Sequence, residues 1–155
     1  MKRTLTSRAL AALLVLSLAG CGGGPELGEV FDGTVNDYDG VTMSVVEGSA
    51  YPGQVSVEIL NATDAEIDSG NEGDFFVQAE RDGQWYALET LQDEYANTAE
   101  AYVYETDVSR ELTLNWTAYY GSLSPGRYRV CKWFFEYRGP GDTTDFLLAA
   151  EFTLE

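Results

Sequence analysis

The sequence predicts an all-β fold, in the form of an antiparallel β-sandwich of seven or eight strands. From residue 41 onward, apolar residues recur at every second position, which is the period of a β-strand and not of an α-helix. Turn signals rich in Gly, Pro and Asp divide this pattern about every ten residues, as they do in sandwiches. No segment has a convincing helical period. A small closed barrel is the alternative architecture with the same pattern.

The predicted strands share the alternation of apolar and polar residues, and turn residues separate them. In chain order they span residues 41–45, 54–59, 75–80, 85–88, 101–105, 111–116, 127–137 and 146–154. Asp82-Gly83 is a strong signal for a tight hairpin between the third and the fourth. Residues 61–73 are polar and turn-rich, so we expect a loop there, and another at residues 90–98.

The N-terminus has the composition of a secretory signal. Three basic residues precede an apolar run over residues 9–18, which is too short to span a bilayer, since that takes about 20 apolar residues. Leu18-Ala19-Gly20-Cys21 follows and resembles a bacterial lipobox, in which the cysteine thiol receives a diacylglycerol and the chain is cut just before it. We therefore predict a lipoprotein signal peptide at residues 1–20, lipidation of Cys21, and attachment to the extracytoplasmic face of a cell membrane. The alternatives are an ordinary cleaved signal with a chance cysteine and an uncleaved membrane anchor.

A flexible acidic tether is predicted between the lipid anchor and the β-domain. Residues 21–39 are rich in Gly and acidic residues, so we expect them not to pack, and we assign the β-sandwich to residues 40–155. Removing the signal leaves 6 basic and 26 acidic residues, which changes the net charge from −17 for the full chain to −20 for the mature chain. A chain this acidic repels phosphate, which excludes nucleic acid as a partner.

The composition also argues against catalysis. The sequence has no histidine, which excludes a Ser-His-Asp triad, a Cys-His pair and a histidine-ligated zinc site. If Cys21 carries lipid, Cys131 has no partner for an intrachain disulfide, and we expect it to be a buried, inert thiol. The sequence therefore predicts a protein that is not an enzyme and has no catalytic residues.

The C-terminal half contains a recognisable motif. Its residues follow the pattern W-x3-YG-x-L-x-PG-x-YR-x2-K, which begins at Trp116 and ends at Lys132. The hairpin at residues 82–86 stands upstream at the expected distance. In these features the chain resembles a bacterial immunoglobulin-like (Ig-like) domain family of lipoproteins and other extracytoplasmic proteins, over roughly residues 39–155. The resemblance implies an Ig-like β-sandwich, a location in the cell envelope and a domain without catalytic residues.

Tyr128 follows Pro125-Gly126 at the start of a late strand, which fits a tyrosine corner. In that motif the phenol hydroxyl bonds to the backbone a few residues upstream and fixes the crossing between the sheets. We therefore expect Tyr128, like Trp85 and Trp116, to be structural and not ligand-binding.

An acidic cluster at residues 64–74 precedes the predicted strand 75–80, and Asp64, Glu66 and Asp68 lie at its start. Calcium takes six to eight oxygen ligands, often from such loops, so these three residues are the candidate calcium ligands. Calcium is the one cofactor that the sequence suggests. The cluster departs from an EF-hand loop, because Ser69 and Phe75 stand where that loop needs Gly and Glu. The alternative is solvated charge that supports solubility.

Arg127, Arg129, Trp133 and Phe135 lie at alternate positions of the predicted strand 127–137, among further aromatic residues. They are the candidates for an exposed aromatic–basic patch that binds a partner protein. The alternative is that the basic residues pair with acidic strands of their own sheet.

The sequence as a whole predicts a lipid-anchored, non-catalytic Ig-like module of the bacterial envelope, which binds or supports another envelope protein. The alternatives are a calcium-binding acidic module and an inhibitor or sensor domain that acts on an envelope peptidase. The last of these depends on analogy at the level of the fold alone.

Overall fold

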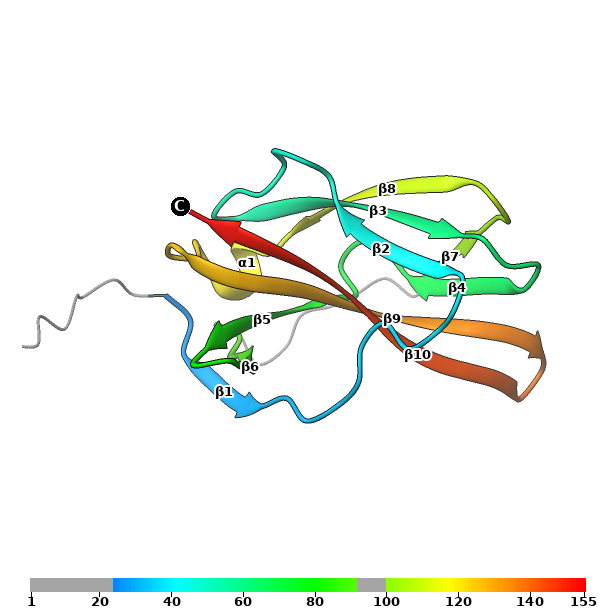
Figure 1. Cartoon of the computed structure of the whole chain (residues 1–155), viewed down its shortest axis with the longest axis horizontal. Helices are drawn as coiled ribbons and strands as arrows, with labels where there is room; N and C mark the ends of the chain where they lie inside the picture. The colour runs from blue at the N-terminus through cyan, green and yellow to red at the C-terminus, as the bar shows by residue number, and fades with distance from the viewer. Residues whose placement is uncertain (1–23, 92–99) are drawn as a thin grey trace, which may run out of the picture.

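The computed structural model describes residues 24–91 and 100–155, which form two antiparallel β-sheets packed face to face (Figure 1). The fold is an all-β sandwich, as the sequence predicts, although the described residues contain ten strands and not seven or eight. The predicted signal peptide, Cys21 and most of the predicted loop at residues 90–98 lie outside the described residues.

The smaller sheet has the strand order β2-β3-β8, with β2 at Val41–Val45, β3 at Gln54–Asn61 and β8 at Ser109–Asn115. The larger sheet contains β1 Leu27–Val30, β4 Glu66–Gly70, β5 Phe76–Arg81, β6 Gln84–Leu88, β7 Ala101–Tyr104, β9 Gly126–Gly139 and β10 Asp142–Leu154. A helical turn, α1 Thr117–Tyr120, follows β8. Within the two described ranges, no helix is long and apolar enough to cross a membrane.

The long strand β9 is the centre of the larger sheet. β10 pairs with it along its whole length, and Figure 1 shows the two strands running together across the molecule. On the other side of β9, β5 pairs with residues 128–131 and β4 with residues 134–137. Two strands therefore share this edge one after the other, and Lys132 and Trp133 lie at the junction between them.

The core lies between the two sheets and receives the inward side chains of both. Val55, Val57 and Ile59 alternate inward from β3 and are fully buried. Trp116 is also fully buried, its Nε1 donates to the carbonyl oxygen of Pro52 at 2.8 Å, and its ring stacks on Phe152 with the centroids 5.5 Å apart. The alternation of apolar and polar residues in the sequence therefore corresponds to strands that bury one face and expose the other.

The predicted hairpin between β5 and β6 turns at Asp82-Gly83. Asp82 has φ 54° and Gly83 has φ 80°, both in the left-handed region. Two consecutive positive φ values are what a type I′ hairpin turn requires, and glycine adopts them without strain. The turn closes a strand pair whose register runs from Gln78 opposite Ala87 to Arg81 opposite Gln84.

β4 lies inside the segment 61–73, which the sequence analysis assigned to a loop, so that assignment is wrong. The strand alternates, with Ile67 and Ser69 buried, Glu66 exposed and Asp68 half-buried. Ser69 takes the place of an apolar residue because its hydroxyl hydrogen-bonds to the hydroxyl of Tyr104 at 2.9 Å. A single apolar residue in five gives no readable strand period.

The predicted tether also differs from the structure, because residues 27–39 lie on the domain. β1 pairs with β6, and the backbone amide of Phe31 donates to the carbonyl of Trp85 at 2.8 Å. Asn36 caps the edge of β10: its amide nitrogen donates to the carbonyl of Ala149 at 3.0 Å, and its side-chain oxygen accepts from the Ala149 amide at 2.9 Å. The ordered domain therefore begins at β1 and not at residue 40, because backbone pairing and one edge-capping asparagine hold the segment.

Candidate binding face

The side chains of β9 alternate between the core and the outer surface of the larger sheet. Tyr128, Val130 and Phe134 point inward and are buried in the main core. The odd-numbered residues 127–137 therefore point outward. These include all four residues of the predicted partner patch.

The structure divides that patch into two halves. Arg127 is exposed at one end of β9 and forms an ion pair with the exposed Glu151 of β10. Trp133 and Phe135 lie further along the strand, where Trp133 is 44% exposed and Phe135 is half-buried. Cys131, which is fully buried, lies between the two halves. The four residues do not form one continuous exposed surface.

Arg129 is only 5% exposed and so belongs to the domain's own structure. Its Nε donates to Oε1 of Gln78 at 2.6 Å. Its guanidinium carbon lies 4.4 Å from the ring centroid of Trp85 and 5.0 Å from that of Phe31. Burial lowers the pKa of Arg129 below its usual value. Arg129 therefore joins β9 to β5, to β6 and to the N-terminal segment, through a neutral amide and two aromatic rings. The alternative from the sequence, pairing with acidic strands of the same sheet, describes Arg127 and not Arg129.

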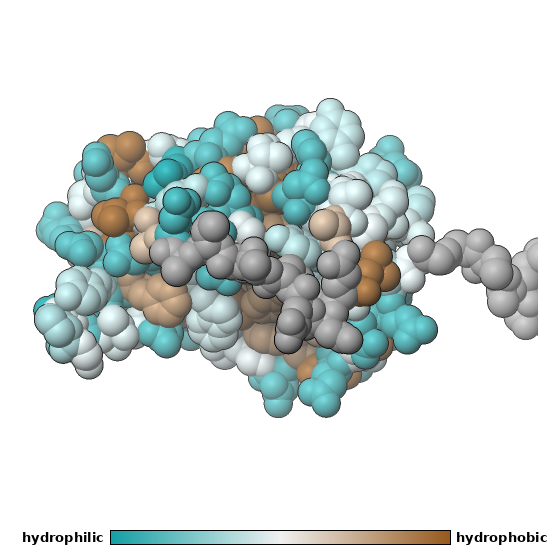
Figure 2. All heavy atoms as spheres, turned by 180° about the vertical axis from the view of Figure 1, so that it is seen from behind, coloured by the Kyte–Doolittle hydropathy of each residue, from teal (hydrophilic) through white to brown (hydrophobic). Residues whose placement is uncertain are grey.

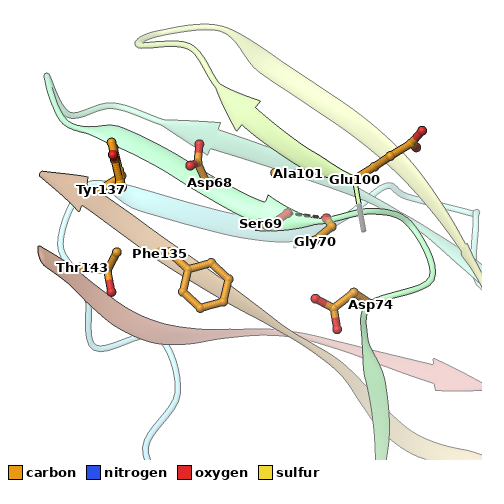
Figure 3. Close-up of a pocket in the computed structure, with 9 residues that line it drawn as sticks. All are labelled: Asp68, Ser69, Gly70, Asp74, Glu100, Ala101, Phe135, Tyr137 and Thr143. Carbon is orange, nitrogen blue, oxygen red and sulfur yellow. Dashed lines mark hydrogen bonds between the residues drawn. The ribbon is translucent and has the colours of Figure 1, made fainter. Parts of the chain in front are cut away.

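A hollow of about 340 Å³ lies on the outer face beside β4 (Figure 3). The rings of Phe135 and Tyr137 line it from β9. Its carboxylates come from β4, from the β4–β5 loop and from the residue before β7: Asp68, Asp74 and Glu100. Figure 3 shows the Asp74 carboxylate turned toward the Phe135 ring, and Glu100 directed away from it. Gly70 lets Asp74 lie there, because a Cβ on Gly70 would overlap the Asp74 side chain.

A second hollow, of about 390 Å³, adjoins Trp133 on the β10 side. The N-terminal segment contributes Phe31 and Asp32, and β10 contributes Asp145. Asp37 also lines this hollow and accepts a hydrogen bond from the Thr34 hydroxyl at 3.0 Å. The second hollow exists because the N-terminal segment lies on the sheet. It could not be predicted from the sequence, in which this segment has the composition of a tether.

The two hollows together form a surface that we call the acidic–aromatic face. It consists of the aromatic residues Trp133, Phe135 and Tyr137 and the carboxylates Asp32, Asp37, Asp68, Asp74, Glu100 and Asp145. No described residue that lines either hollow is basic. The predicted surface was aromatic and basic, whereas the structure surrounds its aromatic residues with negative charge. In the view of Figure 2, hydrophobic atoms of the described residues form small separate groups among hydrophilic ones.

The three predicted calcium ligands do not converge on one point. Asp64 is exposed in the bend before β4, Glu66 is exposed, and Asp68 is half-buried further along the strand. Across residues 24–91 and 100–155, no three His, Cys, Asp or Glu side chains are arranged to hold a metal ion. Asp68 does have an unusual carboxylate: its Oδ1 is buried and has no hydrogen-bond partner in the described part of the chain.

The family of the chain follows from comparison with known proteins. A family model described as a bacterial Ig-like domain matches residues 37–153. This chain belongs to the bacterial Ig-like domain family. The match runs from the N-terminal segment into β10, which confirms the resemblance seen in the sequence. No curated protein and no solved structure matches the chain.

Tyr128 has tyrosine-corner geometry in this Ig-like domain. Its hydroxyl donates to the carbonyl oxygen of Ser124, four residues upstream, at 2.8 Å. Its ring is buried and stacks near Phe152, with the centroids 5.8 Å apart. The residue holds the start of β9 in place and lies away from the acidic–aromatic face.

Lys132 holds in place a loop that lines the first hollow of the Ig-like domain, a role that was not predicted from the sequence. It points to the core side of β9 and is completely buried. Its Nζ donates to the backbone carbonyl oxygens of Asn71 at 2.7 Å and Asp74 at 2.8 Å. Burial lowers the pKa of Lys132 to about 8. Lys132 thereby fixes the β4–β5 loop that carries Asp74. The sequence did contain a signal for its burial, because Lys132 and the apolar Phe134 are two residues apart on one strand and so lie on the same face.

Cys131 of the Ig-like domain is fully buried and free. Burial raises the pKa of its thiol to about 12, so the thiol is protonated at neutral pH. The environment matches the inert thiol expected from the sequence.

Proposed function

We propose that this Ig-like domain is a lipid-anchored, non-catalytic module of the bacterial cell envelope, and that it binds another envelope protein through the acidic–aromatic face. The observation that carries the binding role is the face itself. Two hollows lie along β9. Tyr137 lines the first and is 39% exposed, and Trp133 lines the second and is 44% exposed. Exposed aromatic side chains beside concave surface are typical anchors for a protein partner.

The proposed anchor is Cys21, on the strength of the lipobox-like sequence. Five residues separate Cys21 from Leu27, the first residue of β1. Fully extended, this link spans at most about 20 Å. The proposed anchor would thus hold the start of β1 within this distance of the membrane surface.

Three features support a non-catalytic role. The sequence contains no histidine. The Cys131 thiol is buried, with a pKa of about 12, so it offers no thiolate nucleophile. Bacterial Ig-like domains are in general structural or binding modules.

Metabolic labelling with an alkyne analogue of palmitate tests the anchor. We expect label in the wild type and in Cys131→Ser, and none in Cys21→Ser, because only Cys21 is proposed to carry lipid. Absence of label from the wild type would contradict the anchor.

Site-specific photo-crosslinking in cells tests the binding face. A benzophenone amino acid is placed at position 133, and in a matched control at position 51, since Tyr51 is an exposed aromatic residue next to the smaller sheet. We expect a discrete crosslinked protein from position 133 and none from position 51. The proposal fails if position 133 gives no product, or if both positions give the same one.

A further inference from the structure

We propose that the partner presents a basic, extended polypeptide segment to the acidic–aromatic face, and that lysine or arginine side chains of this segment enter the two hollows. This inference rests on the proposed function and specifies the chemistry of the partner.

Charge complementarity is the first argument. Six carboxylates line the two hollows, and none of the described lining residues is basic. The cations of the domain are engaged elsewhere, as in the pairs Arg127–Glu151 and Arg138–Asp142 and in the packing of Arg110 over Tyr102. Lys132 donates to the backbone carbonyl of Asp74 and not to its carboxylate, and its buried ammonium group offsets only part of the charge of the first hollow, since it interacts with Asp74 alone of the three carboxylates there. A basic segment would supply the missing counter-charges and would be steered to this face.

The second argument is the chemistry of the first hollow. Asp68 lines it, and its buried Oδ1 has no hydrogen-bond partner among the described residues. A buried acceptor without a donor is rare and costly in native proteins. Phe135 is directly opposite Asp68 in the β4–β9 register, so a carboxylate and an aromatic side chain leave the same face of the sheet from paired positions. An ammonium or guanidinium group is the one side-chain chemistry that suits both, through a charge-assisted hydrogen bond and a cation–π contact.

The third argument is shape. The outward residues of β9 follow one another at every second position, about 7 Å apart, and the two hollows lie along the same strand. The side chains of an extended segment that point to one side have the same spacing. An extended segment with basic residues at alternate positions therefore matches the face in both spacing and charge.

The same charges disfavour other occupants. A second copy of this chain would bring a mature net charge of −20 against an acidic face. A bacterial membrane surface is usually anionic as well, and the carboxylates would repel its headgroups.

Binding of a fluorescent alternating Lys-Thr decapeptide to the full-length protein in neutral detergent tests the inference by fluorescence anisotropy. The variant Asp68→Asn/Asp145→Asn removes one carboxylate from each hollow. Glu58→Gln/Glu111→Gln is the matched control, because these two exposed residues face each other on the smaller sheet and the variant removes the same total charge. We expect the dissociation constant to rise at least about tenfold in the first variant and less than about twofold in the control.

Each other outcome overturns the inference. Equal weakening in both variants means that long-range attraction, and not this face, binds the peptide. Undiminished binding of the same decapeptide with acetylated lysines means that positive charge is not what the face recognises. Absence of binding at low ionic strength means that the face does not take a basic segment. Melting temperatures of both variants within about 3 °C of the wild type establish that folding is retained.

Crosslinking at position 133 separates this inference from the proposed function. If a discrete partner is crosslinked but the basic decapeptide does not bind, the proposed function stands and only the inference about a basic segment is wrong. If position 133 gives no crosslinked partner and the decapeptide does not bind, both the proposed function and the inference about a basic segment are wrong.

Discussion

Single side chains shape the first hollow, and Lys132 does so from the core side. Replacing it with methionine keeps most of the length of the side chain but removes the ammonium group that donates to the carbonyl oxygens of Asn71 and Asp74. We expect Lys132→Met to lower the free energy of unfolding by about 1–3 kcal/mol at pH 7, measured by urea denaturation. Arg127→Met is the control, since its ion pair is exposed, and it should cost less than about 1 kcal/mol. Equal effects would contradict this role of Lys132.

The pH dependence of Lys132 has a definite sign. Burial lowers its pKa in the folded protein from 10.5 to about 8, so the unfolded chain binds more protons between these values. The contribution of Lys132 to stability therefore rises as the pH increases through this window. We expect the difference in unfolding free energy between wild type and Lys132→Met to grow by roughly 2 kcal/mol from pH 7.5 to 9.5. A difference that stays constant or shrinks over this range would contradict the lowered pKa of the buried amine.

The hydroxyl of Tyr128 and its buried ring contribute separately to stability, and one substitution isolates the hydroxyl. Tyr128→Phe removes only the hydroxyl that donates to Ser124. We expect a loss of about 1 kcal/mol, which corresponds to a melting temperature lower by about 2–4 °C in calorimetry. Tyr51→Phe, at an exposed position, is expected to leave the melting temperature unchanged.

The elements divide into those that the sequence shows and those that need a tertiary partner. β9, β10 and the β5–β6 hairpin could be predicted, because long alternation and Asp82-Gly83 are local signals. β4 could not, since Ser69 becomes a core residue only through the hydroxyl of Tyr104, a residue distant in sequence. β1 could not either, because its four residues gain their structure by pairing with β6.

The N-terminal segment also has a function within the fold, since it covers Cys131. Phe31 and Val35 pack against the small cluster that contains Cys131, Leu147 and Ala149. In a Cys21→Ser background, we expect Phe31→Ala/Val35→Ala to raise the rate at which a maleimide labels Cys131 by at least about tenfold, because the cover opens more often. Val108→Ala, at an exposed position elsewhere, should leave the rate unchanged. Rapid labelling without any substitution would contradict a packed N-terminal segment.

Across the whole molecule, the arrangement of charge is the property that the sequence could not supply. The carboxylates of the acidic–aromatic face come from the N-terminal segment, β4, the β4–β5 loop, the residue before β7 and β10. The sequence shows Trp133 and Phe135 beside basic residues, whereas the fold buries Arg129 and brings carboxylates to the two rings. The charged residues near these two rings in sequence are basic, whereas those near them in space are acidic. The predicted sign of the surface charge was therefore wrong.

The net charge also predicts how the domain responds to cations. Divalent cations screen the repulsion within a strongly acidic chain, so salt is expected to stabilise it. We expect CaCl₂ and MgCl₂ at equal millimolar concentrations to raise the melting temperature by the same amount, because the described carboxylates form no metal-binding cluster. A larger shift with calcium would instead favour a specific calcium site.

The central claim is that the acidic–aromatic face binds a basic segment, and amide chemical shifts test it most directly. In a titration of isotopically labelled protein with the Lys-Thr decapeptide, we expect saturable shifts at Asp68, Phe135 and Asp145 and at the Trp133 indole. The outer side of the smaller sheet, around Glu58 and Glu111, should not shift. Shifts that centre on the smaller sheet, or that spread evenly over all acidic residues, would contradict the claim.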